Sequence, residues 1–295
     1  MLRDETLRGE PKTARLLFSS LAIVAASGGC TSCKQEDGPV TSPETTAALG
    51  RFIWHELMTN DPAAAASFYS DVMGRTARRD NAEYTTLLNG SVAIGGIPNL
   101  QTWKPGDRPS WTGTVLVDDV DRTVELARDI GGVVTVEPVD LPTARFAILG
   151  DFRGGSMHVS RPTSRVHVRD SSKPGEFDWC EYEATDGFAT FGYYGMLFGW
   201  VSLEERAGSP SGRSTVFGRN GVPIGSIRED QGLDNRWLYF IRVADLEESV
   251  KRALAKGGTL RTEPVTVSDE RVAVLYDPQG AAFALHQSAH ALSGR

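Results

Sequence analysis

Two short motifs place a carboxylate beside a tryptophan. They are Trp54-His55-Glu56 and Trp179-Cys180-Glu181. A glutamate in such a motif can act as a general base or a weak metal ligand. It can equally close an ion pair or cap backbone groups at a sheet edge. His158 and His286 add imidazole groups that could serve in acid–base chemistry. The sequence contains no Gly-rich phosphate loop and no serine-nucleophile elbow.

The composition is that of a globular protein with room for two domains of ordinary size. The chain has 295 residues and a formal net charge of -7, without a block of Lys or Arg, which argues against a nucleic-acid partner. Three cysteines are too few for a disulfide framework.

An internal repeat sets the predicted architecture. Gly50 to Glu56 matches Gly175 to Glu181 at a constant offset, and a second block matches at an offset one residue longer. The repeat predicts two domains, 50–161 and 175–288, joined by a polar linker at 162–174 and followed by a tail at 289–295. We expect each domain to bury its own apolar faces and to fold alone.

Each domain divides again into two βαβββ units. Residues 51–58 alternate in polarity as a strand does. Asp61 is then a good N-cap, Pro62 suits the first helical position, and Gly74 can end the helix. Three short strands follow, near 75–80, 83–88 and 91–96. The same order recurs from the strand at 112–117 and through the second domain, with helices near 120–130, 187–198 and 246–257.

These motifs resemble the vicinal oxygen chelate superfamily, which includes glyoxalases, bleomycin-resistance proteins and dihydroxybiphenyl dioxygenases. The opening Trp54-His55-Glu56, its copy in domain two and the Asp277-Pro-Gln-Gly280 turn carry the resemblance, which covers nearly all of 50–288. It implies an α+β fold of two tandem domains, each a pair of βαβββ units forming a curled mixed sheet, or cup. Fold resemblance does not assign a reaction.

The resemblance also implies where a metal would be held, and those positions are mostly unsuitable. The first-strand positions hold Trp54, Thr112, Trp179 and Leu238, and the last-strand positions of the second units hold His158 and Ala284. The last strands of the first units, 91–96 and 222–226, contain no His, Asp, Glu or Cys. We therefore expect no metal site and no cofactor, although His158 and Glu56 leave room for a weakly held divalent ion.

Side chains of a strand alternate between its two faces, which assigns the candidate residues. Parity places His55 and Cys180 on the core side, as a structural histidine and a buried thiol. The cup face receives Glu56 and His158 as tentative catalytic residues. It also receives the candidate ligand-binding residues Trp54, Thr112, Thr114, Trp179, Glu181, Phe240 and Arg242. His286 has a weaker claim of the same kind.

The first fifty residues indicate export. Basic residues precede an apolar run from Leu16 to Ala26, which suits a signal segment at 1–29. The run ends in Ser27-Gly-Gly-Cys30, which resembles a bacterial lipobox except at Ser27, where an aliphatic residue is usual. Lipidation of Cys30 would anchor the protein to a membrane, facing the periplasm or the cell exterior, with 30–49 as a flexible tether. Plain secretion and a non-exported chain remain alternatives.

Two functions remain open. The first is an exported module that binds a small hydrophobic or aromatic molecule without a complete metal site. The second is a glyoxalase-type lyase or oxygenase that uses Glu56 and His158. A purely structural lipoprotein is a third alternative. The expected partners are a small molecule and, through the anchor, a membrane.

Overall fold

The computed structural model describes residues 43–99, 108–164, 166, 173–209, 212–267 and 269–288. The predicted signal segment, Cys30, the tail and most of the linker lie outside these residues, so they remain predictions. Within the described residues, no helix is long and apolar enough to cross a membrane.

The first half forms one eight-stranded mixed sheet with two helices. Its strands are β1 (Phe52–Met58), β2 (Thr76–Arg79), β3 (Tyr84–Asn89), β4 (Val92–Pro98), β5 (Ser110–Leu116), β6 (Val133–Leu141), β7 (Ala144–Gly150) and β8 (Ser156–Pro162), in the order β2-β3-β4-β1-β5-β8-β7-β6. Helices α3 (Pro62–Met73) and α4 (Val120–Asp129) follow β1 and β5. The two βαβββ units meet where β1 pairs antiparallel with β5, so both units of one half build the same sheet.

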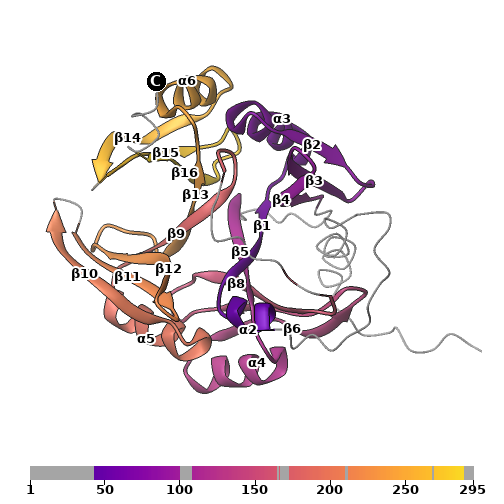
Figure 1. Cartoon of the computed structure of the whole chain (residues 1–295), viewed down its shortest axis with the longest axis vertical. Coiled ribbons are helices and arrows are strands. Elements are labelled where there is room, and N and C mark those ends of the chain that lie inside the picture. The colour runs from indigo at the N-terminus through magenta and orange to yellow at the C-terminus, as the bar shows by residue number, and fades with distance from the viewer. Residues whose placement is uncertain are drawn as a thin grey trace, which may run out of the picture.

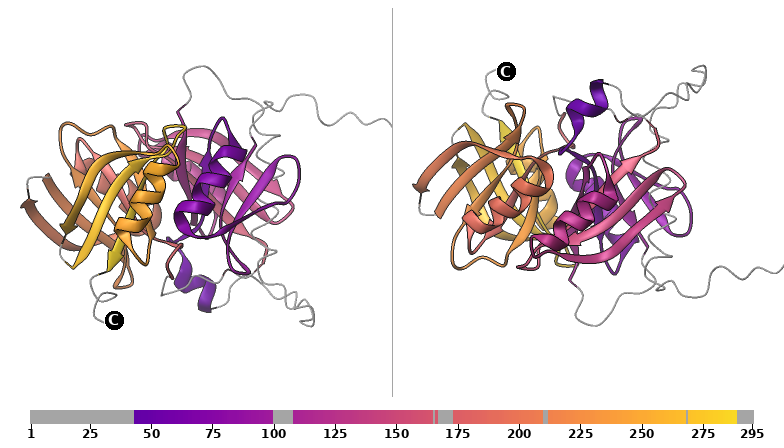
Figure 2. Two further views of the ribbon diagram at one scale, coloured as in Figure 1. Left: turned by 90° about the horizontal axis from the view of Figure 1, so that it is seen from above. Right: turned by 90° about the horizontal axis from the view of Figure 1, so that it is seen from below.

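The second half repeats this topology. Its strands are β9 (Phe177–Ala184), β10 (Val201–Ser209), β11 (Gly212–Arg219), β12 (Val222–Glu229), β13 (Arg236–Arg242), β14 (Thr259–Val267), β15 (Glu270–Tyr276) and β16 (Ala282–Ser288), in the order β10-β11-β12-β9-β13-β16-β15-β14. Helices α5 (Gly187–Phe198) and α6 (Leu246–Ala255) complete it. Figure 2 shows the two halves side by side. The predicted α+β fold of two tandem domains is confirmed.

The predicted helix boundaries follow from local chemistry. The Asp61 side chain accepts a hydrogen bond from the Ala64 amide at 3.0 Å, and Pro62 occupies the first helical position. Gly74 ends α3 in the left-handed conformation at φ 64°, where a side chain would be strained. An aspartate caps each of the other three long helices in the same way, at Asp119, Asp186 and Asp245.

The end of the predicted tether differs from expectation. Pro43–Ala48 forms a short helix, α2, in which Thr45 and Ala48 are buried. Gly50 then donates its amide hydrogen to the Leu116 carbonyl at 2.8 Å. The polar composition concealed this helix because only contacts with the folded body give it a buried side.

One apolar core serves both halves, which corrects the expectation of two separate cores. The main cluster joins Leu57, Tyr69 and Val159 of the first half to Tyr194 and Phe283 of the second. Helix α3 packs against α6, and α4 packs against α5, as Figure 1 shows at the top and bottom of the molecule. Strand parity predicts which face is apolar. It does not predict that the two helical faces cover each other.

Two related hydrogen bonds tie the halves together. The Tyr69 hydroxyl donates to the Asp277 carboxylate at 3.1 Å, and its repeat equivalent Tyr194 donates to Asp151 at 2.9 Å. Each aspartate sits in a tight turn and also accepts backbone amides of that turn. Asp151 receives a further hydroxyl from Tyr182 at 2.5 Å. The repeat therefore links each half to the turn of the other.

Candidate functional site

The face of the first sheet opposite its helices, called here the first cup face, gathers the predicted polar residues. In the strand register Glu56 lies opposite Thr112, Trp54 opposite Thr114, and Thr114 beside His158. All five residues are buried, with exposures of 1% for Glu56 and 2% for His158. The parity assignment therefore brings them together on β1, β5 and β8. Their functional roles remain predictions.

Tyr84 completes the centre of this face and was missed by the sequence reasoning. Its hydroxyl donates to Glu56 Oε1 at 2.8 Å and accepts from Trp54 Nε1 at 3.0 Å. The ring occupies space that only a glycine on β4 leaves free, because a Cβ at Gly96 would lie 1.8 Å from the hydroxyl oxygen. The Gly95-Gly96 pair inside a strand was the available signal, since such glycines often mark a close approach.

Burial sets unusual proton affinities at this centre. Burial raises the pKa of Glu56 to about 7, against the opposing hydrogen bonds from Tyr84 and Trp54. Burial also lowers the pKa of His158 to about 3, so this imidazole is neutral near pH 7. His158 Nδ1 and Glu56 Oε2 lie 3.5 Å apart, and neither atom has a hydrogen-bond partner within the described part of the chain. Near pH 7 the Glu56 carboxyl group is therefore divided between its protonated and ionised forms, and it faces a neutral imidazole.

Five buried polar atoms on this face lack partners among the described residues. They are Glu56 Oε2, Thr112 Oγ1, Thr114 Oγ1, His158 Nδ1 and Ser160 Oγ. Leaving one buried polar group without a partner costs about 1–3 kcal/mol. Such a concentration on three adjacent strands is the arrangement expected where a water or a ligand supplies the missing partners.

An apolar wall borders these atoms. Leu141, Ala144, Phe146 and Ile148 form a separate buried cluster, and Met58 packs against it. The Phe146 ring meets the His158 imidazole edge to face, with centroids 5.1 Å apart. The first cup face therefore combines unpartnered hydrogen-bonding groups with aliphatic and aromatic surface.

The corresponding face of the second sheet is built differently. Leu238, Phe240 and Ala284 stand where the first sheet has Thr112, Thr114 and His158, and they form an apolar cluster against Trp179. The Trp179 indole donates to Ser226 at 3.3 Å, and Ser226 donates to Glu181 at 3.1 Å. The predicted ligand-binding residues Trp179 and Glu181 thus both hydrogen-bond to Ser226, and Phe240 packs against Trp179.

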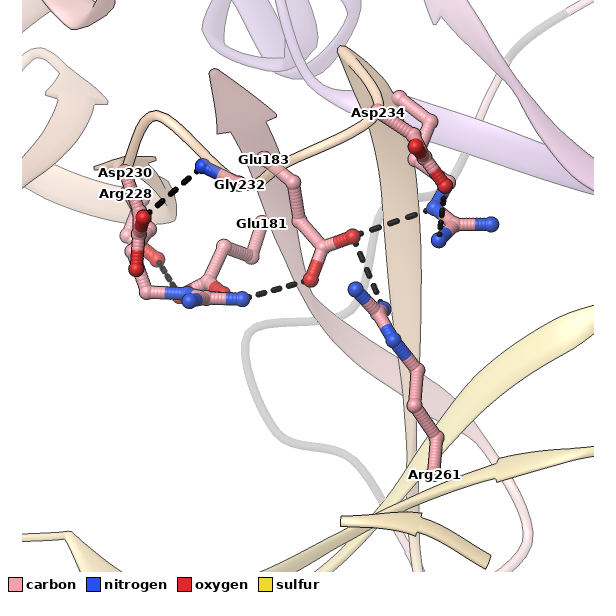
Figure 3. A network of polar contacts seen from close by, with 9 residues as sticks. Glu181, Glu183, Arg228, Asp230, Gly232, Asp234 and Arg261 are labelled. Carbon is pink, nitrogen blue, oxygen red and sulfur yellow. Dashed lines mark hydrogen bonds and ion pairs between the residues drawn. The ribbon is translucent and has the colours of Figure 1, made fainter. Parts of the chain in front are cut away.

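A network of ion pairs closes the same region around Glu183 (Figure 3). This fully buried carboxylate accepts Arg228 at 2.6 Å, Arg261 at 2.9 Å and Arg236 at 3.1 Å. Arg228 also pairs with Glu181 at 2.8 Å. A buried carboxylate needs such partners, and removing one typically costs about 3–5 kcal/mol. Glu181 and Glu183 of the second sheet are therefore held in ion pairs that stabilise the fold.

Arg242 and His286 form another paired cluster in the second half. Strand β9 carries one extra residue at Asp178, where the register with β13 shifts between Phe240 and Ile241. Asp178 consequently meets Arg242 at 2.7 Å and His286 at 2.5 Å. Burial by itself lowers the pKa of His286. The hydrogen bonds to Asp178 and Glu270 outweigh burial and raise the pKa to about 9.

The residues assigned to the core side lie there. His55 stacks on Phe177 with ring centroids 4.3 Å apart and meets Tyr239 edge to face at 5.0 Å. Burial lowers the pKa of this imidazole to about 3. Cys180 is a buried free thiol whose pKa is raised, first by burial and then by Glu181. His55 belongs to the contact between the halves, because Phe177 and Tyr239 lie in the second half. Cys180 belongs to the packing beneath the second sheet.

The residues present do not make a complete metal centre. On the described part of the first cup face, Glu56 and His158 are the strong ligand groups that converge, and a catalytic zinc site normally has three protein ligands. Tyr84 fills the place beside Gly96, and Trp54 donates its indole N–H to Tyr84. No group of three or more His, Cys, Asp or Glu residues suited to a metal exists in the described part of the chain.

Comparison with known proteins agrees with this architecture. Residues 51–158 match the model of the Glyoxalase/Bleomycin resistance protein/Dioxygenase superfamily. The anthracycline biosynthesis protein DauV of Streptomyces sp. (strain C5) is 26% identical, over 82% of this chain and 94% of its own.

Two solved structures share the fold. The Mn(II)-bound glyoxalase from Novosphingobium aromaticivorans aligns with a TM-score of 0.60 and 13% identity, over 81% of this chain and 82% of that chain. The 2,3-dioxygenase LapB from Pseudomonas sp. KL28 aligns with a TM-score of 0.56 and 12% identity, over 82% of this chain and 93% of that chain. Residues 51–158 of this protein thus resemble the glyoxalase, bleomycin resistance and dioxygenase superfamily, and the second half repeats the fold of the first.

Proposed function

We propose that the first cup face binds a small molecule with a hydrophobic or aromatic body and at least one hydrogen-bonding group. The observation that carries this proposal is the set of five buried, unpartnered polar atoms on β1, β5 and β8. A ligand that paired with them would remove their desolvation penalty, while Phe146 and Ile148 would contact its apolar part. The name of the relative DauV, an anthracycline biosynthesis protein, supports an aromatic ligand.

Binding in this proposal needs no metal. Glu56, with a pKa of about 7, can accept or donate a hydrogen bond according to its protonation. His158, neutral near pH 7, offers a nitrogen as acceptor or donor according to its tautomer. The second cup face lacks equivalent groups, since Ala284 and Leu238 replace His158 and Thr112.

The test combines native mass spectrometry with titration. Protein lacking the signal segment should retain an organic adduct, or should bind an anthracycline probe at one site per chain. His158→Ala should weaken binding about tenfold, the effect of losing one hydrogen bond to the ligand. Ser226→Ala, a change on the second cup face, is the matched control and should leave binding unchanged. Absence of both adduct and probe binding argues against the proposal, as does equal weakening by the control.

A lyase or oxygenase of glyoxalase type is the second candidate, favoured by one observation. Glu56 has a proton affinity matched to neutral pH, as a general base requires, and Oε2 is unpartnered. In this reading Glu56 would take a proton from the bound substrate and His158 would orient the substrate. Assays with added Mn(II), using a 2-oxoaldehyde–thiol adduct and a catechol, test it. Turnover that is lost in Glu56→Gln would favour this candidate over a binding module.

We also propose that Cys30 is lipidated and holds the protein on a membrane. The small residues before Cys30 and the apolar run of 16–26 support this location. Thr31 after the cysteine favours the outer membrane in a Gram-negative host. The full chain should incorporate labelled fatty acid, and Cys30→Ser should abolish the label. Untruncated, unlabelled protein in the cytosol would contradict the proposal.

A further inference from the structure

Helix α5 presents an unusually apolar outer surface. Its sequence, GFATFGYYGMLF, contains no charged residue. Phe188 is 86% exposed and Met196 is 58% exposed, and the exposed Gly192 lies between them at helical spacing. A phenylalanine on the surface loses the hydrophobic free energy that burial would give it. A surface of this kind indicates an interaction site.

The internal repeat supplies a control for this surface. At the equivalent positions of α3 the chain has Ala63, Ser67 and Asp71, and Asp71 pairs with Lys256 at 2.7 Å. The contrast continues into the next strand, where Val201 and Leu203 are exposed and β2 instead carries Thr76 and Arg78. The fold itself therefore tolerates small or polar residues at these positions, and packing does not explain the large apolar ones.

The start of the folded chain lies at the same place. Trp200 Nε1, two residues beyond α5, donates to the Gly50 carbonyl at 2.7 Å. A Cβ at Gly50 would lie 2.8 Å from the Phe198 carbonyl oxygen, so the backbone passes directly against the end of α5. From Thr31 to the first described residues the chain can reach at most roughly 40 Å. An anchor at Cys30 would therefore keep this side of the molecule near the lipid.

Basic groups flank the apolar surface. Arg153 lies at the beginning of α5, where it pairs with Asp186 at 2.9 Å and its guanidinium lies over the Phe152 ring. Arg219 lies at the other end, beside Gly199 and Gly50. An apolar helix face with Arg219 at one end and the ion-paired Arg153 at the other suits the boundary between acyl chains and anionic headgroups.

We propose that the outer face of α5, with Phe188 and Met196 as its inserted side chains, rests on an anionic phospholipid surface. The proposal extends the proposed lipid anchoring. The anchor would supply attachment, and α5 would fix the orientation of the protein against the membrane. The first cup face would then be held at a constant angle to the bilayer.

The experiment uses the chain from Thr31 onward, which contains every described residue but no lipid anchor. Flotation with vesicles of phosphatidylethanolamine and phosphatidylglycerol should carry this protein, and vesicles of phosphatidylcholine alone should carry less. The double variant Phe188→Asp, Met196→Asp should reduce the bound fraction about tenfold. Ala63→Asp, the equivalent position on α3, is the matched control and should leave flotation unchanged. Phe188→Ala, Met196→Ala provides the same test without new charge.

Three results would overturn the proposal. One is absence of flotation of the unmodified chain, and another is flotation of both double variants equal to that of the unmodified chain. The third is dimerisation in solution that these variants abolish, which would assign α5 to a second copy. Failure of the anchor is separate, because it is read from fatty-acid labelling of the full chain. Failure of small-molecule binding is also separate, because the probe binds on the opposite side of the sheet from the helices.

Discussion

At the scale of single residues, the two sheets differ in whether the glutamate at the centre of the cup face has an ion-pair partner. The pair Glu56 and Glu181 occupies equivalent places, yet Glu56 has an unpartnered oxygen whereas Glu181 is held by Arg228. Burial raises the pKa of both carboxyl groups. Only the first is left with hydrogen-bonding capacity for another molecule.

Thr114→Val tests whether that capacity serves binding. The Thr114 hydroxyl is buried without a partner among the residues that the structure describes, and valine has nearly the same shape. The variant should therefore be more stable by about 1 kcal/mol in urea unfolding, while ligand binding weakens. Thr86→Val is the control, because the Thr86 hydroxyl donates to Asp80 at 2.5 Å and its loss should destabilise. Equal destabilisation by both changes would mean that the Thr114 hydroxyl is already satisfied.

Glu56 should make stability depend on pH in a specific window. Its pKa is about 7 in the folded protein and 4.5 in the reference state, so the folded state holds an extra proton between these values. The contribution of Glu56 to the free energy of unfolding should therefore fall as pH rises from 4.5 to 7, by up to about 3 kcal/mol.

Urea unfolding at pH 5 and pH 8 measures this, compared with Glu56→Gln. Both proteins retain His55, His158 and His286, whose pKa values are also shifted, so the contributions of these residues cancel in the comparison. The variant should gain stability relative to the parent as pH rises. A constant difference between the two proteins would show that Glu56 titrates normally.

At the scale of elements, a helix of each half contacts a turn of the other half. The Tyr69 hydroxyl of α3 reaches the Asp277 turn, and Tyr194 of α5 reaches the Asp151 turn. The two links are unequal, because Asp151 also accepts the Tyr182 hydroxyl. Each carboxylate otherwise depends on backbone amides of its own turn.

This inequality predicts different costs for two equivalent changes. Tyr69→Phe leaves Asp277 without a hydroxyl donor and should destabilise by about 2 kcal/mol, as expected for a lost bond to a charged group. Tyr194→Phe leaves Asp151 with Tyr182 and should cost less. Tyr193→Phe, which removes a bond to the neutral Gly150 carbonyl, is a reference for both. Thermal melting ranks the three, and a larger loss for Tyr194→Phe than for Tyr69→Phe would contradict the account.

At the scale of the whole molecule, the aromatic contact between the halves is continuous. Phe52 of the first half lies within 6.0 Å, between ring centroids, of Trp200, Trp237 and Tyr239 of the second. The Tyr239 hydroxyl accepts the Gly113 amide hydrogen at 2.8 Å. Large aromatic surfaces of this kind contribute strongly to stability when they are buried.

Fragments 50–161 and 175–288 should therefore fail to melt cooperatively when separated, contrary to the expectation from the repeat alone. Mixing or co-expression should restore a one-to-one complex with a cooperative transition, measured by circular dichroism and size exclusion. Protein cleaved within 162–174 after folding, the control, should remain associated. A sharp, concentration-independent transition in either isolated fragment would contradict the shared core.

The sequence by itself determined the repeat, the helix caps and the faces of the strands. These follow from local rules, because an Asp cap and strand alternation depend only on neighbours in the chain. Parity thus placed Glu56, Thr112, Thr114 and His158 on one face before any contact was known. Tertiary structure alone decided which of these groups are satisfied. Tyr84 reaches Glu56 only because the sheet brings β3 and β4 beside β1, and Asp178 reaches His286 only through the extra residue in β9. The shared core likewise depends on two helical faces meeting across a distance that no local pattern encodes.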